Sequence, residues 1–184
     1  MGILSGINQK RLFRTILANS RQRLYRMAFS WTHDPALADD LVQQTCYQAL
    51  RKQRHLREIE AADAWLFRIL ANCLADHHRA RREVLTGDEL LIIEKWTPEH
   101  ATHEDQIAQR VRKAVAALPL AHRQVVTLVD LEGFSYAAVA QILDIPVGTV
   151  MSRLSRGRRA LREHLLDVAA KSGIDVPAKV RRIK

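Results

Sequence analysis

The chain has 184 residues, of which 47% are hydrophobic and 5% aromatic, enough apolar material for one domain or two small ones. A net charge of +9 and a pI of about 10.1 favour a polyanionic partner. No apolar run approaches the roughly 20 residues of a membrane span, and the N-terminus lacks the continuous apolar core of a signal peptide. We therefore expect a cytoplasmic protein without a membrane span.

The charge falls into three blocks along the chain. Residues 1–82 hold 14 Lys and Arg against 7 Asp and Glu (net +7), residues 83–105 hold 1 against 7 (net −6), and residues 106–184 hold 14 against 6 (net +8). Two basic blocks around an acidic one are typical of two nucleic-acid-binding modules and a connector. We predict a first domain over 1–82, a flexible acidic linker over 83–105, a second domain over 106–169 and a basic tail over 170–184.

Apolar residues at helical spacing predict a first helix from about Asn8 to Trp31, and the pattern allows a break near Asn19–Ser20. Asp34 as N-cap and Pro35 at the first helical position predict a second helix, which runs to about Lys52. The outward face of this helix is rich in Gln and begins with acids, so it is either a solvated face or a protein-docking surface. Its members are Asp40, Gln43, Gln44, Tyr47, Gln48 and Arg51, with Asp39 at the border.

A polar stretch, Gln53 to Glu60, interrupts the helical pattern and is interpreted as a loop. A third helix follows from about Ala61 to Arg82, with Trp65 assigned to the core. A second face of this helix combines an amide with basic side chains, namely Arg68, Asn72, Arg79 and Arg82. A lone Asn is usually a plain surface residue. An Asn among arginines beside a basic loop is a candidate reader of bases.

Two further helices are predicted after the linker, from Gln106 to Leu118 and from Pro119 onward, and Gly133 is a candidate left-handed C-cap for the second. The second helix is expected to bury a set of aliphatic side chains, namely Val125, Val126, Leu128, Val129 and Leu131. The amphipathic pattern favours a packed helical domain here.

The stretch from Phe134 to Leu165 has the pattern of a helix-turn-helix. Ser135 is a candidate N-cap for the first helix, and Asp144–Pro146 is a tight break before the second. The apolar stripe of the second helix is Val147, Val150, Leu154, Leu161 and Leu165, and Gly157 on this stripe would let another helix approach closely. The opposite face carries Thr149, Ser152, Arg153, Ser155, Arg156 and Arg159. Such a face suits the major groove, although it could also be an ordinary solvated face.

We expect no enzymatic activity and no cofactor. The sequence has no strand signal, phosphate-binding glycine pattern, paired carboxylates or nucleophile motif. Cys46 and Cys73 lack metal-ligand spacing and are expected to be buried thiols. His100 and His103 have no third ligand nearby, so a metal site is not expected.

Three blocks together resemble the extracytoplasmic-function sigma factors of bacterial RNA polymerase. DPALADDLVQQTCYQAL is similar to their segment that grips the clamp helices of the largest polymerase subunit. AWLFRILANCLADHHRARR is similar to their promoter −10 segment, and the stretch from Leu118 to Leu165 is similar to their −35-binding domain. The resemblance covers about residues 8–82 and 106–166. It implies an all-α fold of two small helical domains, with polymerase core (clamp helices and flap), promoter DNA and an anti-sigma factor as partners.

The resemblance also implies roles for individual residues. The outward face of the Pro35 helix would bind polymerase, and the displaced −10 strand would be held by Arg68, Asn72, Arg79 and a loop. The loop residues are Gln53, Arg54, His55, Leu56, Arg57 and Glu58. The polar face of the last helix would meet the −35 element. Met151 and Ser155 depart from the family pattern and leave the −35 preference open, and the −10 loop has no aromatic residue.

Two hypotheses from other functional classes also remain open. A stand-alone helix-turn-helix repressor or activator would bind duplex DNA tightly by itself, and its site would be palindromic. A helical adaptor for acidic proteins would show no sequence preference. The sigma-factor hypothesis predicts instead that sequence-specific DNA binding needs polymerase, because a flexible linker leaves the spacing of the two modules undefined.

Overall fold

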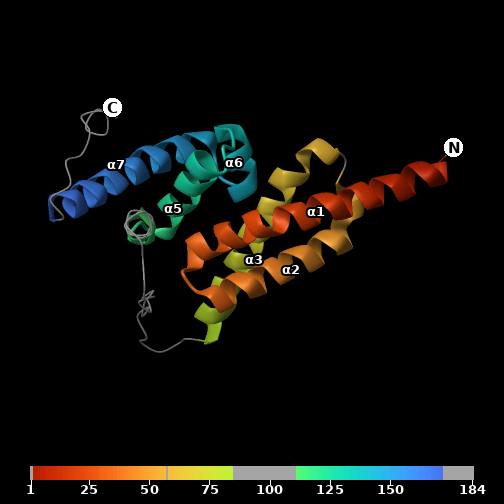
Figure 1. Ribbon diagram of the computed structural model, residues 1–184, viewed down its shortest axis with the longest axis horizontal. Helices are drawn as coiled ribbons and strands as arrows, with labels where there is room; N and C mark the ends of the chain where they lie inside the picture. The colour runs from red at the N-terminus through yellow and green to blue at the C-terminus, as the bar shows by residue number, and fades with distance from the viewer. Residues whose placement is uncertain (1, 57, 85–110, 172–184) are drawn as a thin grey trace.

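The computed structural model describes residues 2–56, 58–84 and 111–171, with side chains described over 11–56, 58–81 and 111–166 (Figure 1). All secondary structure in these residues is helical, as the sequence predicts. Arg57, most of the acidic linker and the tail from residue 172 lie outside the described residues. The linker and the tail therefore remain predictions.

The N-terminal module consists of α1 (Gly2–Thr32), α2 (Pro35–Lys52) and α3 (Ala62–Val84). Helices α1 and α2 form an antiparallel hairpin, and α3 packs against both (Figure 1). Two 3₁₀ turns, Gln53–His55 and Ile59–Ala61, occupy the predicted loop between α2 and α3. The start of α2 is confirmed, because the Asp34 carboxylate accepts a hydrogen bond from the Leu37 backbone N–H at 3.0 Å and Pro35 begins the helix.

Helix α1 does not break at Asn19–Ser20. Polar residues in mid-helix favour a break when their side chains compete for backbone hydrogen bonds. The Ser20 hydroxyl instead donates to the Asp63 carboxylate on α3 at 3.2 Å, and the residue is only 3% exposed. A tertiary partner 43 residues away therefore keeps α1 continuous.

The C-terminal module begins with a helical stretch at residues 111–116 and continues with α5 (Leu120–Val126), α6 (Tyr136–Leu143) and α7 (Val147–Lys171). Pro119 and Pro146 each lie one residue before a helix rather than at its first position, a one-residue correction to the prediction. Gly133 has a φ of +75°, which confirms the left-handed turn expected there.

Helix α5 runs into a π-helical turn, Thr127–Leu131, that the sequence did not reveal. A π turn holds more residues per turn than an α-helix, so it shifts the faces of the residues after it. Val125, Val126 and Leu128 are buried as expected, but Val129 is only half-buried and Leu131 is 67% exposed, contrary to the prediction. The change of pitch is the reason, because an α-helical period places Leu131 on the inner face.

The two modules pack directly against each other, with α6 lying beside α3 and α5 near α1 (Figure 1). Buried apolar residues of both modules form one continuous core. The expectation that their spacing is undefined is therefore wrong for this state of the chain. The modules have one fixed relative position, set by contacts of α1 and α3 with the C-terminal module.

Candidate nucleic-acid interface

Helices α6 and α7 form the predicted helix-turn-helix. The Ser135 hydroxyl caps α6 by accepting a hydrogen bond from the Ala138 backbone N–H at 3.2 Å, which confirms its assignment. Asp144 ends α6 in the left-handed region with a φ of +52°, a conformation that Asp tolerates better than most residues. The Pro146 carbonyl then accepts from the Thr149 and Val150 N–H groups at 2.9 and 3.1 Å, which starts α7.

One side of α7 is anchored in the module and the other is open. Val150 and Leu154 are buried, while Leu161 and Leu165 are half-buried and Val147, expected on the same stripe, is 43% exposed. Gly157 is buried against α5, and a Cβ atom there would lie 2.6 Å from Cγ2 of Val126. The close approach predicted at this glycine is confirmed.

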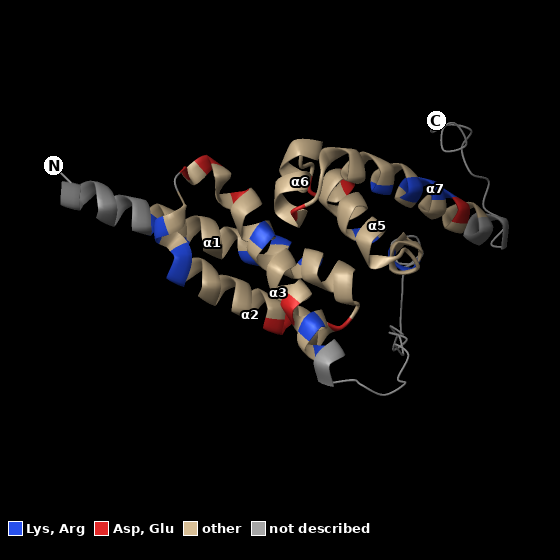
Figure 2. Cartoon of the chain, turned by 180° about the vertical axis from the view of Figure 1, so that it is seen from behind, with Lys and Arg blue, Asp and Glu red and all other residues tan. Residues whose placement is uncertain are grey.

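The open side of α7 carries the residues expected to read DNA. Ser152, Ser155, Arg156 and Arg159 are exposed, and Thr149 and Arg153 are half-buried. Basic residues follow one another along this helix (Figure 2). Arg158, outside the predicted face, pairs with Asp130 through two hydrogen bonds of 2.5 and 3.1 Å. Within the described residues, no salt bridge engages Arg153, Arg156 or Arg159, so their guanidinium groups are available to a ligand.

The candidate −10 residues lie on α3 and on the turns before it. Arg68, Asn72 and Arg79 are exposed and share one face of the helix, and Arg79 donates to Asp76 at 3.3 Å. Arg54, His55 and Glu58 are exposed, whereas Gln53 and Leu56 are half-buried. Leu56 packs against the core, so the loop offers mainly polar groups to a base.

The candidate polymerase face on α2 is exposed except at Gln48, which is half-buried, contrary to the prediction. Its exposed members are Asp39, Asp40, Gln43, Gln44, Tyr47 and Arg51. Tyr47 is 58% exposed, and the Arg51 guanidinium lies 5.5 Å from the centre of its ring. Tyr and Arg are both enriched at protein–protein interfaces relative to the rest of the surface.

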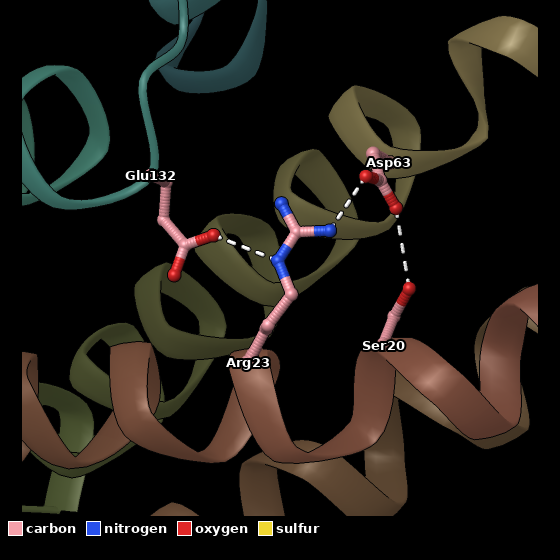
Figure 3. Close-up of polar contacts among 4 residues, drawn as sticks. All are labelled: Ser20, Arg23, Asp63 and Glu132. Atoms are coloured by element: carbon pink, nitrogen blue, oxygen red, sulfur yellow. Dashed lines mark hydrogen bonds and ion pairs between the residues drawn. The ribbon is translucent and has the colours of Figure 1, made fainter.

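The two modules meet through a set of side chains that sequence reasoning did not single out as a group. We call this contact the seam and define it by Arg23, Trp31, Phe67, Arg123, Thr127, Glu132 and Phe134. Arg23 donates from Nε to Glu132 at 2.9 Å and from NH1 to Asp63 at 2.6 Å (Figure 3). Its guanidinium also lies 5.5 Å from the Phe67 ring centre. One arginine thus joins α1, α3 and the end of the π turn.

The remaining seam contacts are more deeply buried. Trp31 Nε1 donates to the Thr127 hydroxyl at 2.9 Å, and Arg123 donates to the Trp31 carbonyl at 2.8 Å. Arg123 also donates to the carbonyls of Ala116 and Leu118 at 2.6 and 2.8 Å, so its charge is balanced by carbonyl dipoles. The Phe67 and Phe134 rings meet edge to face, with their centroids 5.1 Å apart.

His33 lies beside this network, at the turn between α1 and α2. Burial and the nearby Arg123 guanidinium lower its pKa from 6.5 to about 4, and its Nε2 has no hydrogen-bond partner among the residues that the structure describes. His33 is thus neutral at physiological pH. Cys73 is buried as expected, whereas Cys46 is half-buried, and burial raises the pKa of both thiols.

The described residues offer neither a metal site nor a bilayer-crossing helix. No group of three or more His, Cys, Asp or Glu side chains comes together among them. His100 and His103 lie outside the described residues. No helix within this part of the chain combines the length and apolar character that crossing a bilayer requires.

Comparison with known proteins identifies both modules. The family model for Sigma-70 region 2 matches residues 17–84, and that for Sigma-70, region 4 matches residues 108–161. The RNA polymerase sigma-H factor of Pseudomonas aeruginosa is 32% identical over 169 residues, which cover 85% of this chain and 87% of that protein. The ECF RNA polymerase sigma factor SigE of Mycolicibacterium smegmatis is 32% identical over 148 residues, covering 78% of this chain and 57% of that protein.

The chain belongs to the extracytoplasmic-function sigma factor family.

A solved relative has the same architecture. The sigma factor RpoE, crystallised with the anti-sigma factor NepR from Bartonella quintana, matches with a TM-score of 0.74 at 34% identity. The match covers 83% of this chain and 96% of that one. In the present chain, the N-terminal module is therefore region 2 and the helix-turn-helix module is region 4. The hypothesis of a stand-alone repressor is not favoured.

Proposed function

We propose that this sigma factor directs core RNA polymerase to promoters through three separate faces. The exposed face of α2 binds core, α3 with the preceding turns holds the opened −10 strand, and the open face of α7 reads the −35 duplex. The observation that carries this is the row of arginines on α7, Arg153, Arg156 and Arg159, which form no salt bridge within the described residues and stand on a helix-turn-helix whose other side is anchored by buried aliphatic residues. Promoter opening needs one site that recognises duplex DNA and another that holds a single strand, and this chain offers a candidate for each.

Each DNA-binding face suits its substrate chemically. Arginine can bind guanine bidentately in the major groove, and serine hydroxyls can bond bases or phosphates. A base extruded from the stack can be held through its Watson–Crick edge, which the Asn72 amide can satisfy. We assign these tasks to segments 106–169 and 1–82, with 83–105 as the linker and 170–184 as the tail.

The sigma factor needs no catalytic group of its own for this role, and we place its action in the cytoplasm with polymerase. An anti-sigma factor is a further partner by analogy, because RpoE was solved with NepR. The exposed faces of both modules are available for such a protein. An anti-sigma factor bound to these faces would compete with polymerase for them.

The test is transcription by purified sigma-free core on a genomic promoter library, with and without the chain. We expect defined start sites only when both are present. By itself the chain should bind DNA mainly through phosphates, with a Kd around 10⁻⁴–10⁻⁶ M that weakens steeply with salt. Nanomolar binding of a palindrome by the free chain, with no transcripts, would refute the proposal in favour of a stand-alone repressor.

A further inference from the structure

One exposed apolar side chain borders the hydroxyl groups on the open side of α7. Met151 is 54% exposed, directly precedes Ser152 and stands four residues before Ser155. We propose that Met151 reads a thymine in the −35 element by contacting the C5-methyl group of that base in the major groove. This inference rests on the proposed function, because it assigns one base preference to the helix that meets the −35 duplex.

Folding does not account for the placement of this methionine. The apolar side of α7 packs through Val150 and Leu154, both of which are buried. Within the described part of the chain, Met151 belongs neither to the buried core nor to the half-buried side chains packed against it. Its thioether chain is therefore in contact with water in the free protein, and an apolar ligand group that covered it would bind favourably.

The position of Met151 along α7 suits contact with a base edge. It lies four residues after Val147, where α7 begins, and the N-terminal residues of a recognition helix are the ones that contact bases. Side chains four residues apart are neighbours on a helix surface, so Met151 lies next to Ser155. Both line a groove along α7 that is also lined by Tyr136, the first residue of α6.

The chemistry at the start of α7 fits thymine better than the other bases. Residues 147–152 carry no charged side chain, so this part of the helix cannot bind guanine through a guanidinium group. In the major groove thymine alone presents a methyl group, and its O4 accepts hydrogen bonds. Met151 supplies a flexible apolar surface for the methyl group, and the Ser152 hydroxyl can donate to O4. The arginines that follow remain able to bind guanine at neighbouring base pairs.

Replacing thymine by deoxyuridine isolates the contact, because deoxyuridine keeps O4 and the pairing with adenine but lacks the methyl group. Burial of one methyl group against an apolar side chain changes affinity by about a factor of four. We therefore expect deoxyuridine at one −35 thymine to weaken DNA binding by about three- to fivefold.

The test uses holoenzyme assembled from the full chain and purified core, on the −35 element that this holoenzyme selects from a promoter library. Each −35 thymine, on either strand, is replaced singly by deoxyuridine, and the Kd for DNA is measured. Met151→Ala removes the apolar contact and Met151→Leu keeps it. Leu131→Ala is the matched control, because Leu131 is an exposed apolar residue of the same module in the π turn. Circular dichroism and the affinity for core verify that each variant is folded and binds polymerase.

We expect one position at which wild type, Met151→Leu and Leu131→Ala bind thymine about three- to fivefold more tightly than deoxyuridine, while Met151→Ala binds both equally. A preference for thymine that persists in Met151→Ala would assign the methyl contact to another residue. Equal binding of thymine and deoxyuridine by wild type at every −35 position would show that no methyl group is read. If Met151→Ala weakens core binding, or weakens binding to every DNA sequence equally, the residue contacts polymerase or phosphates and the inference is overturned.

Failure of the proposed function would give a different result. Wild-type holoenzyme would then select no −35 element, and Arg156→Ala would leave DNA preference unchanged. If Arg156→Ala does relax preference at a −35 base pair but no thymine methyl group affects binding, the proposed function stands and only the role of Met151 is refuted.

Discussion

The packing of α7 on α5 at Gly157 allows a quantitative test of how the DNA-reading helix is held. In a Gly157→Ala chain the new methyl group would lie 2.6 Å from Cγ2 of Val126 and 3.5 Å from Cβ of His122. Val126 is 3% exposed, and its β-branched side chain has one strongly preferred rotamer in a helix. The contact cannot be relieved by a simple rotation, so one helix must shift.

Two opposing terms decide the effect on stability. Replacing glycine by alanine in a helix interior favours folding by about 1 kcal/mol. Overpacking a close contact costs about 1–3 kcal/mol. The net free energy of unfolding should therefore fall by about 0–2 kcal/mol, against the gain of about 1 kcal/mol at an uncrowded site.

The decisive measurement is a double-mutant cycle with Val126→Ala. That change alone removes two methyl groups and should cost about 2 kcal/mol. In its background the clash is gone, so Gly157→Ala should now stabilise the chain by about 1 kcal/mol. Urea unfolding followed by circular dichroism gives all four free energies, provided that the m-values agree. If Gly157→Ala has the same effect in both backgrounds, the close contact does not limit this position.

The other predictions concern the three binding faces and the buried histidine. Arg156→Ala should relax preference at one −35 base pair, costing about 1–3 kcal/mol in specific binding, and a binding assay over all single −35 variants measures it. Asn72→Ala should impair opening of the −10 region while leaving −35 binding intact; normal permanganate reactivity in the variant would count against it. Asp40→Lys with Gln43→Ala should weaken core binding without unfolding the chain, and an unchanged Kd for core would refute the assignment of α2. Because folding lowers the pKa of His33 from 6.5 to about 4, its contribution to stability is complete above pH 6.5 and is lost as the pH falls toward 4. His33 has a left-handed backbone with a φ of +55°, which Asn also tolerates, so the urea midpoint should drop less across this window in His33→Asn than in wild type.

Local sequence signals predicted most of the fold because the groups that satisfy them are close in the chain. Asp34 and Ser135 each cap the helix that follows by accepting a hydrogen bond from the backbone N–H three residues on. Gly133 adopts the left-handed conformation that glycine permits. Helix faces were also predictable wherever the pitch is regular. The exposed faces of α2 and α7 follow directly from a 3.6-residue period.

The seam escaped prediction because its partners are distant in sequence and its residues look ordinary in isolation. Arg23 fits a solvated basic face, yet it binds Glu132, 109 residues away. Arg123 has no acid nearby, and only the folded chain brings the Trp31 carbonyl to it. One hint of the seam was present in the sequence: Arg123 lies within an apolar stretch, and a buried arginine needs a hydrogen-bonding partner.

The π turn at Thr127–Leu131 also sets how this chain can tolerate changes in length. A π turn is equivalent to one residue inserted into an α-helix. Deleting a residue from it would restore the regular pitch, and these two changes cancel, so the residues after the turn would keep their faces. The Glu132–Arg23 contact would then be kept, whereas an insertion or deletion in the regular part of α5 would rotate Glu132 away from Arg23 by about 100°. A related sequence one residue shorter at the π turn, but otherwise alike, would keep both the helix-turn-helix and this contact between the modules.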